Sequence, residues 1–186
     1  PSKQVSDLIA TNGTGFDTII LGVSWSRDTR NRAIFATRGS LYSLSSEVAI
    51  PGGDLEYYKI RYRHQQYFPL AGKLVLLMKA ALAYGDGYGN TSRLPFYENF
   101  FSGGTRSVRG FDDNSLGPKD EFGNPLGGSF KVGGNAEIIF PLPFIEDQRQ
   151  MKSVLFIDGG NVFNTNCLDI SSICTDIKDG ELRYTA

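Results

Sequence analysis

The sequence predicts an all-β protein, and two observations support that prediction. Apolar and polar residues alternate along separate stretches of roughly ten residues, the period of strands with one apolar and one polar face. Aromatic residues and glycine are frequent, with 13 Phe, 9 Tyr and 22 Gly in 186 residues, and aromatic side chains favour strands over helices. No apolar repeat of helical period extends over a useful length. We therefore expect antiparallel strands in an up-and-down order.

Each expected strand gathers its apolar residues at alternate positions. In the first, Ile19, Leu21 and Val23 share one face, with Thr18 and Gly22 on the other. Side chains alternate in direction along a strand, so this pattern gives each strand two different faces. The expected strands cover residues 17–28, 39–50, 55–67, 73–85, 133–140 and 153–163, and a seventh begins near Leu182.

Strand length and the content of the polar faces favour a transmembrane β-barrel. About 9–11 residues cross a bilayer when a strand is tilted. The third stretch carries Lys59, Arg61 and Arg63 in its polar phase, and such charges suit the wet interior of a barrel. Aromatic residues near strand ends fit the two membrane–water interfaces, namely Trp25, Tyr42, Tyr67, Phe68, Tyr84 and Phe140. A soluble β-domain is the alternative, because its strands also alternate.

The connections between the strands have two lengths. Residues 51–54 and 68–72 form short turns, whereas residues 86–132 and 164–181 form long loops. In bacterial barrels the long loops lie outside and the short turns face the periplasm. Two strands separate the two long loops, so up-and-down alternation places both on the same side. We expect residues 1–186 to form one partial barrel domain with a long extracellular loop, 86–132.

The long loop carries the strongest candidate for a functional site, the tetrapeptide Val108-Arg109-Gly110-Phe111. An Arg between apolar neighbours in a glycine-rich loop suggests a charged tip that enters the interior. Its guanidinium presents five donors in a fixed fork, which suits carboxylates. Glu137 and Asp158 lie in the polar phase of neighbouring strands, so we expect both to be partners of Arg109. In the alternative, Arg109 is a solvated loop residue and the carboxylates are ordinary charges of the polar faces.

Composition and motifs argue against several other classes. The net charge of −1 and a pI near 5.9 give no bias toward nucleic acid, and no apolar run is long enough for a transmembrane helix. The glycine-rich segment 85–89 lacks the Lys-Ser/Thr pair of a phosphate-binding loop. We find no nucleophile with a neighbouring base, so the sequence predicts neither an enzyme nor a cofactor.

The two cysteines, Cys167 and Cys174, lie close together in the second long loop. Their spacing suits a local disulfide in an oxidising compartment, and two free thiols are the alternative. The sequence has a single His, His64, and no Cys-x-x-Cys pair. We therefore expect no metal site and interpret His64 as an interfacial residue.

Several motifs, taken in order, resemble the outer-membrane β-barrel assembly family, BamA type. They include Pro95 to Gly104, the tetrapeptide 108–111 and Gly117-Pro118. The other matching segments are Glu56-Tyr57-Tyr58-Lys59, Tyr84-Gly85-Asp86-Gly87, Gly133-Gly134-Asn135 and Phe156-Ile157-Asp158-Gly159-Gly160-Asn161-Val162. The resemblance covers nearly the whole chain.

This resemblance implies a sixteen-stranded barrel, of which the chain holds the eighth to thirteenth strands and the start of the fourteenth. It also implies that the long loop is the sixth extracellular loop and folds into the lumen, where Arg109 meets Glu137 and Asp158. Compared with this family, we expect the periplasmic POTRA domains, the first strands, the last two strands and the aromatic C-terminal signal to lie outside these 186 residues. We therefore expect a piece of a longer protein, whose two open edges allow copies to pair edge to edge.

The resemblance further implies a function, the folding and insertion of β-barrel proteins into the bacterial outer membrane without chemical catalysis. The implied partners are the outer-membrane bilayer, nascent barrel proteins, and assembly-complex lipoproteins that bind the periplasmic domains. One alternative is a two-partner secretion or translocation-assembly barrel of the same superfamily. A second alternative is a passive porin or adhesin barrel, in which Arg109 would not matter for assembly.

Overall fold

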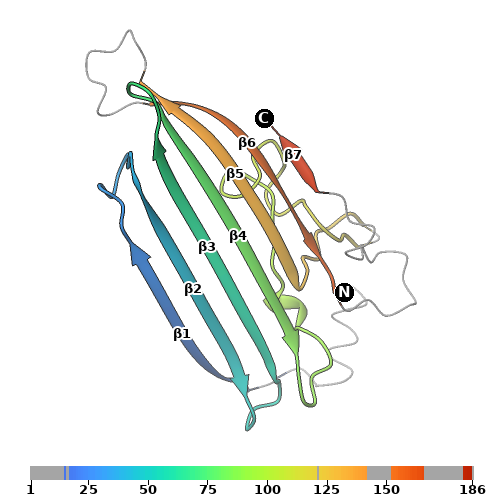
Figure 1. Cartoon of the computed structure of the whole chain (residues 1–186). Coiled ribbons are helices and arrows are strands. Elements are labelled where there is room, and N and C mark those ends of the chain that lie inside the picture. Colours follow the sequence, from blue (N-terminus) through green and yellow to red (C-terminus); the bar gives the residue numbers. More distant parts are fainter. Residues whose placement is uncertain (1–14, 16, 121, 142–151, 166–181, 186) are drawn as a thin grey trace.

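The computed structural model describes residues 15, 17–120, 122–141, 152–165 and 182–185. They form one antiparallel sheet in which each strand pairs with the next one along the chain (Figure 1). The strands are β1 (Ile19–Asp28), β2 (Gly39–Ile50), β3 (Tyr57–Pro69), β4 (Val75–Gly87), β5 (Phe130–Phe140), β6 (Ser153–Phe163) and β7 (Arg183–Thr185), and a 3-10 helix, η1 (Phe96–Glu98), lies between β4 and β5. The expected up-and-down, all-β order is confirmed. No helix in these ranges is long and apolar enough to span a membrane.

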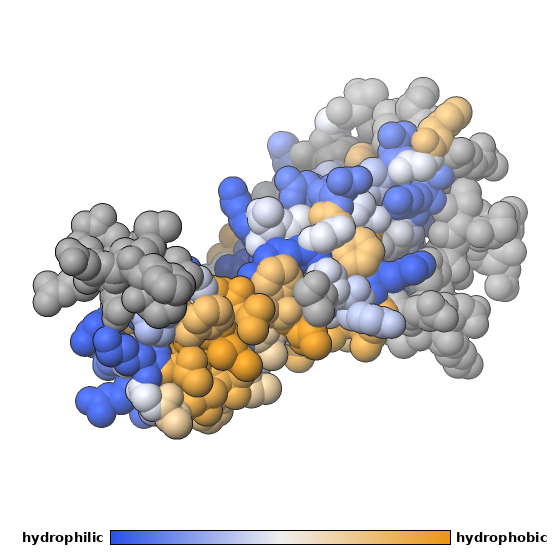
Figure 2. Space-filling view, turned by 90° about the horizontal axis from the view of Figure 1, so that it is seen from above, coloured by the Kyte–Doolittle hydropathy of each residue, from blue (hydrophilic) through white to orange (hydrophobic). Residues whose placement is uncertain are grey.

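The apolar face of the sheet is exposed and charged residues of the polar face are buried, which is the reverse of the arrangement in a water-soluble protein. On the apolar face, Val23 and Leu155 are 70% and 65% exposed, and Figure 2 shows apolar side chains gathered in one large patch. On the polar face, which carries Lys59, Glu137 and Asp158, these three charged residues are all buried. Charged residues are almost never buried unless they are paired. Lipid against the apolar face and a barrel interior against the polar face account for both observations.

Aromatic rings on the apolar face form a row near the ends of four strands, β3 to β6. The rings belong to Tyr58, Tyr84, Phe130 and Phe163, at successive centroid distances of 6.0, 6.5 and 6.0 Å. Further along the same face, Tyr42 stacks on His64 at 4.3 Å. Tyr and Trp rings are enriched at membrane–water interfaces, so the row marks the edge of the apolar band on the side from which the β4–β5 loop leaves.

Several strand ends lie beyond the predicted boundaries. β3 continues to Pro69, which pairs with Val75, because a proline is tolerated at a strand end where its missing N–H is not needed. β4 extends to Gly87 and β5 begins at Phe130, which pairs with Tyr84. Glycine-rich segments hide the apolar–polar alternation, so the loop expected at 86–132 spans only 88–129.

The β4–β5 loop (88–129) lies over the polar face of the sheet (Figure 1). Its first arm packs Leu94 and Phe100 into a buried cluster that includes Leu55 and Tyr57. Phe100 and Gly128 exchange two backbone hydrogen bonds, of 2.8 and 3.0 Å, which tie the two arms of the loop together. The paired arms carry the tip of the loop along the sheet toward the middle of β5 and β6.

Candidate functional site

The tip of the loop is held by three residues, Arg109, Glu137 of β5 and Asp158 of β6, which we call the tip clamp. Arg109 Nε donates to Asp158 Oδ2 at 2.6 Å, and Arg109 Nη2 donates to Asp158 Oδ1 and Glu137 Oε1, both at 2.7 Å. The backbone N–H of Arg109 also donates to Asp158 Oδ2, at 3.1 Å. Bidentate, charge-assisted bonds of this kind are the strongest hydrogen bonds in proteins. The structure thus brings together the Arg and the two carboxylates that the sequence singled out.

A second cation and an aromatic ring complete the surroundings of the tip clamp. Lys79 of β4 donates to Glu137 Oε1 at 2.7 Å, and the guanidinium carbon of Arg109 lies 3.6 Å from the centroid of the Phe156 ring. Two cations therefore face two carboxylates, and the cluster is neutral. The Asp158 side chain is 0% exposed, so loss of Arg109 would leave a buried carboxylate without its cation, at a cost of roughly 3–5 kcal/mol.

The tip clamp stabilises the charged form of Arg109. Its hydrogen bond to Asp158 raises the pKa of Arg109, the negative charges of Glu137 and Asp158 raise it further, and partial burial opposes them. An Arg side chain is protonated at every physiological pH even without such help. The cation of the tip clamp therefore acts as a fixed charge rather than as a proton donor.

Two glycines let the loop and the wall approach each other closely. A Cβ on Gly160 of β6 would lie 2.6 Å from the Val132 carbonyl oxygen and 3.2 Å from Val108 Cγ2, and Val108 is fully buried. Gly110 has a φ of 84°, a conformation that glycine adopts without steric cost. A Cβ on Gly110 would also crowd Thr185 of β7, at 2.8 Å. The apolar and glycine positions of the tetrapeptide thus shape the seat in which Arg109 is held.

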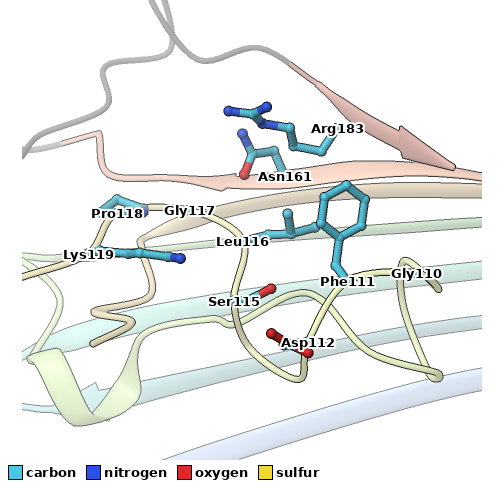
Figure 3. Close-up of a pocket in the computed structure, with 10 residues that line it drawn as sticks. All are labelled: Gly110, Phe111, Asp112, Ser115, Leu116, Gly117, Pro118, Lys119, Asn161 and Arg183. Carbon is cyan, nitrogen blue, oxygen red and sulfur yellow. The ribbon is translucent and has the colours of Figure 1, made fainter. Parts of the chain in front are cut away.

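Beyond the tip clamp, a hollow of about 760 Å³ separates the loop from the last two strands. Figure 3 shows Phe111 pointing toward Asn161 of β6 and Arg183 of β7, while Lys119 borders the hollow from the loop side. Of the four tetrapeptide residues, Val108 and Arg109 thus face the wall at the middle of β6, and Phe111 borders open space.

The remaining predicted residues have different outcomes. Cys167 and Cys174 lie outside the described residues, so the disulfide stays a prediction. In the part of the chain that the structure describes, no group of three His, Cys, Asp or Glu side chains could hold a metal ion.

Sequence reasoning missed three residues around the tip. Lys79 and Phe156 contact the tip clamp, and Asn135 Nδ2 donates to the Ser107 carbonyl oxygen at 2.9 Å. All three belong to the polar face: Lys79, Asn135 and Asp158 are aligned across β4, β5 and β6, and Phe156 is paired with Glu137. The alternation that identified Glu137 and Asp158 was therefore also the available signal for these neighbours.

The sheet and the clamped loop define a class of protein, a transmembrane β-barrel in which a long loop folds back onto the inner wall and is fastened there by an Arg. Residues 2–183 match the Omp85 superfamily domain. The chain belongs to the Omp85 superfamily.

Individual relatives agree with this membership. The chain is 38% identical over 154 residues to the outer membrane protein assembly factor BamA of Neisseria meningitidis serogroup B, a match that covers 81% of this chain and 19% of that protein. It is 32% identical over 148 residues to the mouse sorting and assembly machinery component 50 homolog, covering 75% of this chain and 30% of the relative. The chain thus spans less than a third of the length of these relatives.

A solved structure shows the same fold. The crystal structure of BamA from Haemophilus ducreyi lacking POTRA domains 1-3 is similar, with a TM-score of 0.79 and 29% sequence identity. The match covers 89% of this chain and 36% of that one. The seven-stranded open sheet is therefore a fragment of a BamA-type barrel.

Proposed function

We propose that the chain is part of the wall of a barrel that folds and inserts other β-barrel proteins. The observation that carries the proposal is the tip clamp, a neutral and largely buried cluster that fastens a long loop across the wall. Its occurrence in a chain 38% identical to an outer membrane protein assembly factor supports the assembly role. The same identity and the Omp85 domain assign the chain to the bacterial outer membrane.

In this proposal the loop acts as a brace rather than as a catalyst of chemical steps. Arg109 joins the loop to β5 and β6 at once, and Lys79 extends the connection to β4 through Glu137. A charged link across three strands resists a change in their relative positions, because moving the strands apart would leave the buried carboxylates without their cations. The braced wall keeps its shape while an edge elsewhere in the barrel opens and serves as the template for a client strand.

The proposal also assigns the loop to one side of the outer membrane and names the binding partners. We take the β4–β5 loop to be extracellular and to fold into the lumen, and the apolar face to contact the outer-membrane bilayer. Nascent barrel proteins are the proposed clients, and lipoproteins of an assembly complex would bind periplasmic domains of the full-length protein. In the isolated fragment, the open edges at β1 and β7 would pair with those of a second copy.

The test is charge reversal of Arg109 in the full-length protein, supplied to cells depleted of the normal copy. We expect Arg109→Glu to lower the levels of several unrelated outer-membrane barrels, because two buried carboxylates would face a third. Arg106→Glu is the matched control, since Arg106 lies in the same loop but is exposed. Adding Asp158→Arg to Arg109→Glu restores the charge balance and should recover part of the loss. Unchanged barrel levels with Arg109→Glu would refute the assembly role of the clamp.

The same measurement separates the two alternatives. A two-partner secretion or translocation-assembly barrel predicts the loss of one exported polypeptide while general barrel levels stay normal. A passive porin or adhesin barrel predicts no assembly defect at all, and pore conductance that survives removal of the loop.

A further inference from the structure

The β4–β5 loop is also fastened near the strand ends from which it leaves. Five residues form this second contact, the rim clamp: Glu98, Phe100 and Phe101 of the loop, Lys59 of β3 and Lys131 of β5. We infer that the rim clamp positions the first arm of the loop independently of Arg109 and keeps it on the wall when the tip is released. The inference deepens the proposed function and rests on it, because it concerns how the same brace is held.

The contacts of the rim clamp combine an ion pair, a ring and a backbone carbonyl. Lys59 Nζ donates to Glu98 Oε2 at 2.5 Å and lies 5.3 Å from the centroid of the Phe100 ring. Lys131 Nζ donates to the carbonyl oxygen of Phe101 at 2.6 Å. A cation over an aromatic face adds to the ion pair. Two strands that are separated by β4 therefore both hold residues 98–101.

Burial indicates that the wall depends on the loop at this place. The Lys59 side chain is only 6% exposed, and a buried ammonium group needs a partner. Glu47 lies opposite Lys59 in the register of β2 and β3, but its carboxylate is bound by Arg61 at 2.6 Å, and Arg61 itself lies 5.7 Å from the centroid of the Phe100 ring. Among the described residues, the salt bridge of Lys59 is the one with Glu98. β3 therefore presents a cation that a loop carboxylate neutralises.

The rim clamp and the tip clamp are far enough apart to act separately. They share no residue, and Lys131 precedes Glu137 by six positions in β5. At about 3.4 Å per residue, this spacing corresponds to roughly 20 Å along the strand. Sites more than about 7–10 Å apart that share no partner contribute nearly additively.

Limited proteolysis of the folded, full-length protein in detergent tests the inference. The rate of cleavage within residues 88–129 is measured by mass spectrometry for Glu98→Gln and for Asp28→Asn, the matched control. Both substitutions replace one carboxylate of an ion pair by its amide, but the Asp28–Arg30 pair involves neither the loop nor β3. We expect Glu98→Gln to accelerate loop cleavage about tenfold, since the loss of a charged hydrogen bond costs about 1.5 kcal/mol or more, and Asp28→Asn to leave the rate within about twofold.

A charge swap distinguishes a positioning role from a general loss of stability. Lys59→Glu combined with Glu98→Lys should return the cleavage rate toward that of the unchanged protein, while each single reversal accelerates it. Equal rates for Glu98→Gln and Asp28→Asn would overturn the inference, and so would a swap no better than its single changes. If the Lys59 variants do not fold, the comparison of Glu98→Gln with Asp28→Asn still decides.

The readout is independent of the proposed function, because cleavage requires no client protein. Loss of protection supports the rim clamp even if the levels of client barrels stay normal. In that case the assembly role of the loop would fail while its second fastening would stand.

Discussion

The tip clamp and the rim clamp fasten one loop with opposite arrangements of charge. At the tip, the loop supplies the cation, Arg109, and the wall supplies the carboxylates of Glu137 and Asp158. At the rim, the wall supplies the cation, Lys59, and the loop supplies Glu98. Complementary charges suppress wrong pairings as well as stabilise the right one. Because the two clamps have opposite charge arrangements, neither loop residue can bind at the other clamp. This opposition fixes where the loop lies along the wall better than two clamps of the same arrangement would.

The two clamps also differ in the number of charged contacts that they make. Arg109 makes three hydrogen bonds with Asp158 and one with Glu137, whereas Glu98 joins one ion pair. Each clamp joins a buried partner, Asp158 or Lys59, to a partner about a quarter exposed, Arg109 or Glu98, so the number of charge-assisted hydrogen bonds rather than burial separates them. We therefore expect the tip clamp to contribute most of the stability and the rim clamp to contribute position.

The largest expected effect comes from removing the cation of the tip clamp. Arg109→Leu leaves Asp158 and Glu137 with Lys79 as their remaining cation, and should destabilise the folded barrel by roughly 3–5 kcal/mol. The shift of the denaturant midpoint of the folded barrel measures this loss, and Arg106→Leu, at an exposed position, is the control. Equal shifts for the two variants would mean that the tip clamp contributes no more than an exposed loop charge.

A smaller effect is expected when the charge is kept and the fork is lost. Arg109→Lys cannot donate to Asp158 and Glu137 from one planar group, and should cost about 1.5–3 kcal/mol, the range of hydrogen bonds to charged groups. The same denaturant titration measures it. If Arg109→Lys is as stable as the unchanged protein, net charge rather than fork geometry holds the tip.

The smallest expected effect is the coupling free energy between the two clamps. The losses of stability caused by Arg109→Lys and by Glu98→Gln should add in the double variant to within about 0.5 kcal/mol, because the sites share no residue. The four-variant cycle measures this coupling free energy. A coupling free energy above about 1 kcal/mol would show that the two clamps act as a single cooperative unit.

Much of the sheet could be predicted from the sequence because alternation is local. The phase of the apolar residues gave the strands and placed Glu137 and Asp158 on the face to which the loop docks, where both are found. The strand boundaries at Gly87 and Phe130 were missed, because glycine-rich segments carry no alternation. Alternation placed Lys79 on the same face, but its contact with Glu137 depends on the register, which sets Lys79 opposite Asn135, two positions from Glu137, and a single strand considered alone does not show that register.

The rim clamp could not be predicted in the same way. Glu98 belongs to a short 3-10 helix within an irregular loop, so no period assigns it to a face. Lys59 was noted as a charge of the polar phase, but its partner lies 39 positions along the chain. Contacts between a strand and an irregular loop depend on the path of the loop, which only the folded chain defines.

The aromatic row has a mechanical consequence for the loop. Tyr58 and Phe130 belong to that row, and each directly precedes a cation of the rim clamp, Lys59 or Lys131. Successive side chains of a strand point to opposite faces, so each ring that meets the bilayer surface stands back to back with a side chain that grips the loop. We therefore expect a displacement of the bilayer surface at this height to act on residues adjacent to the rim clamp, so that a change in membrane thickness would shift the loop inside the barrel.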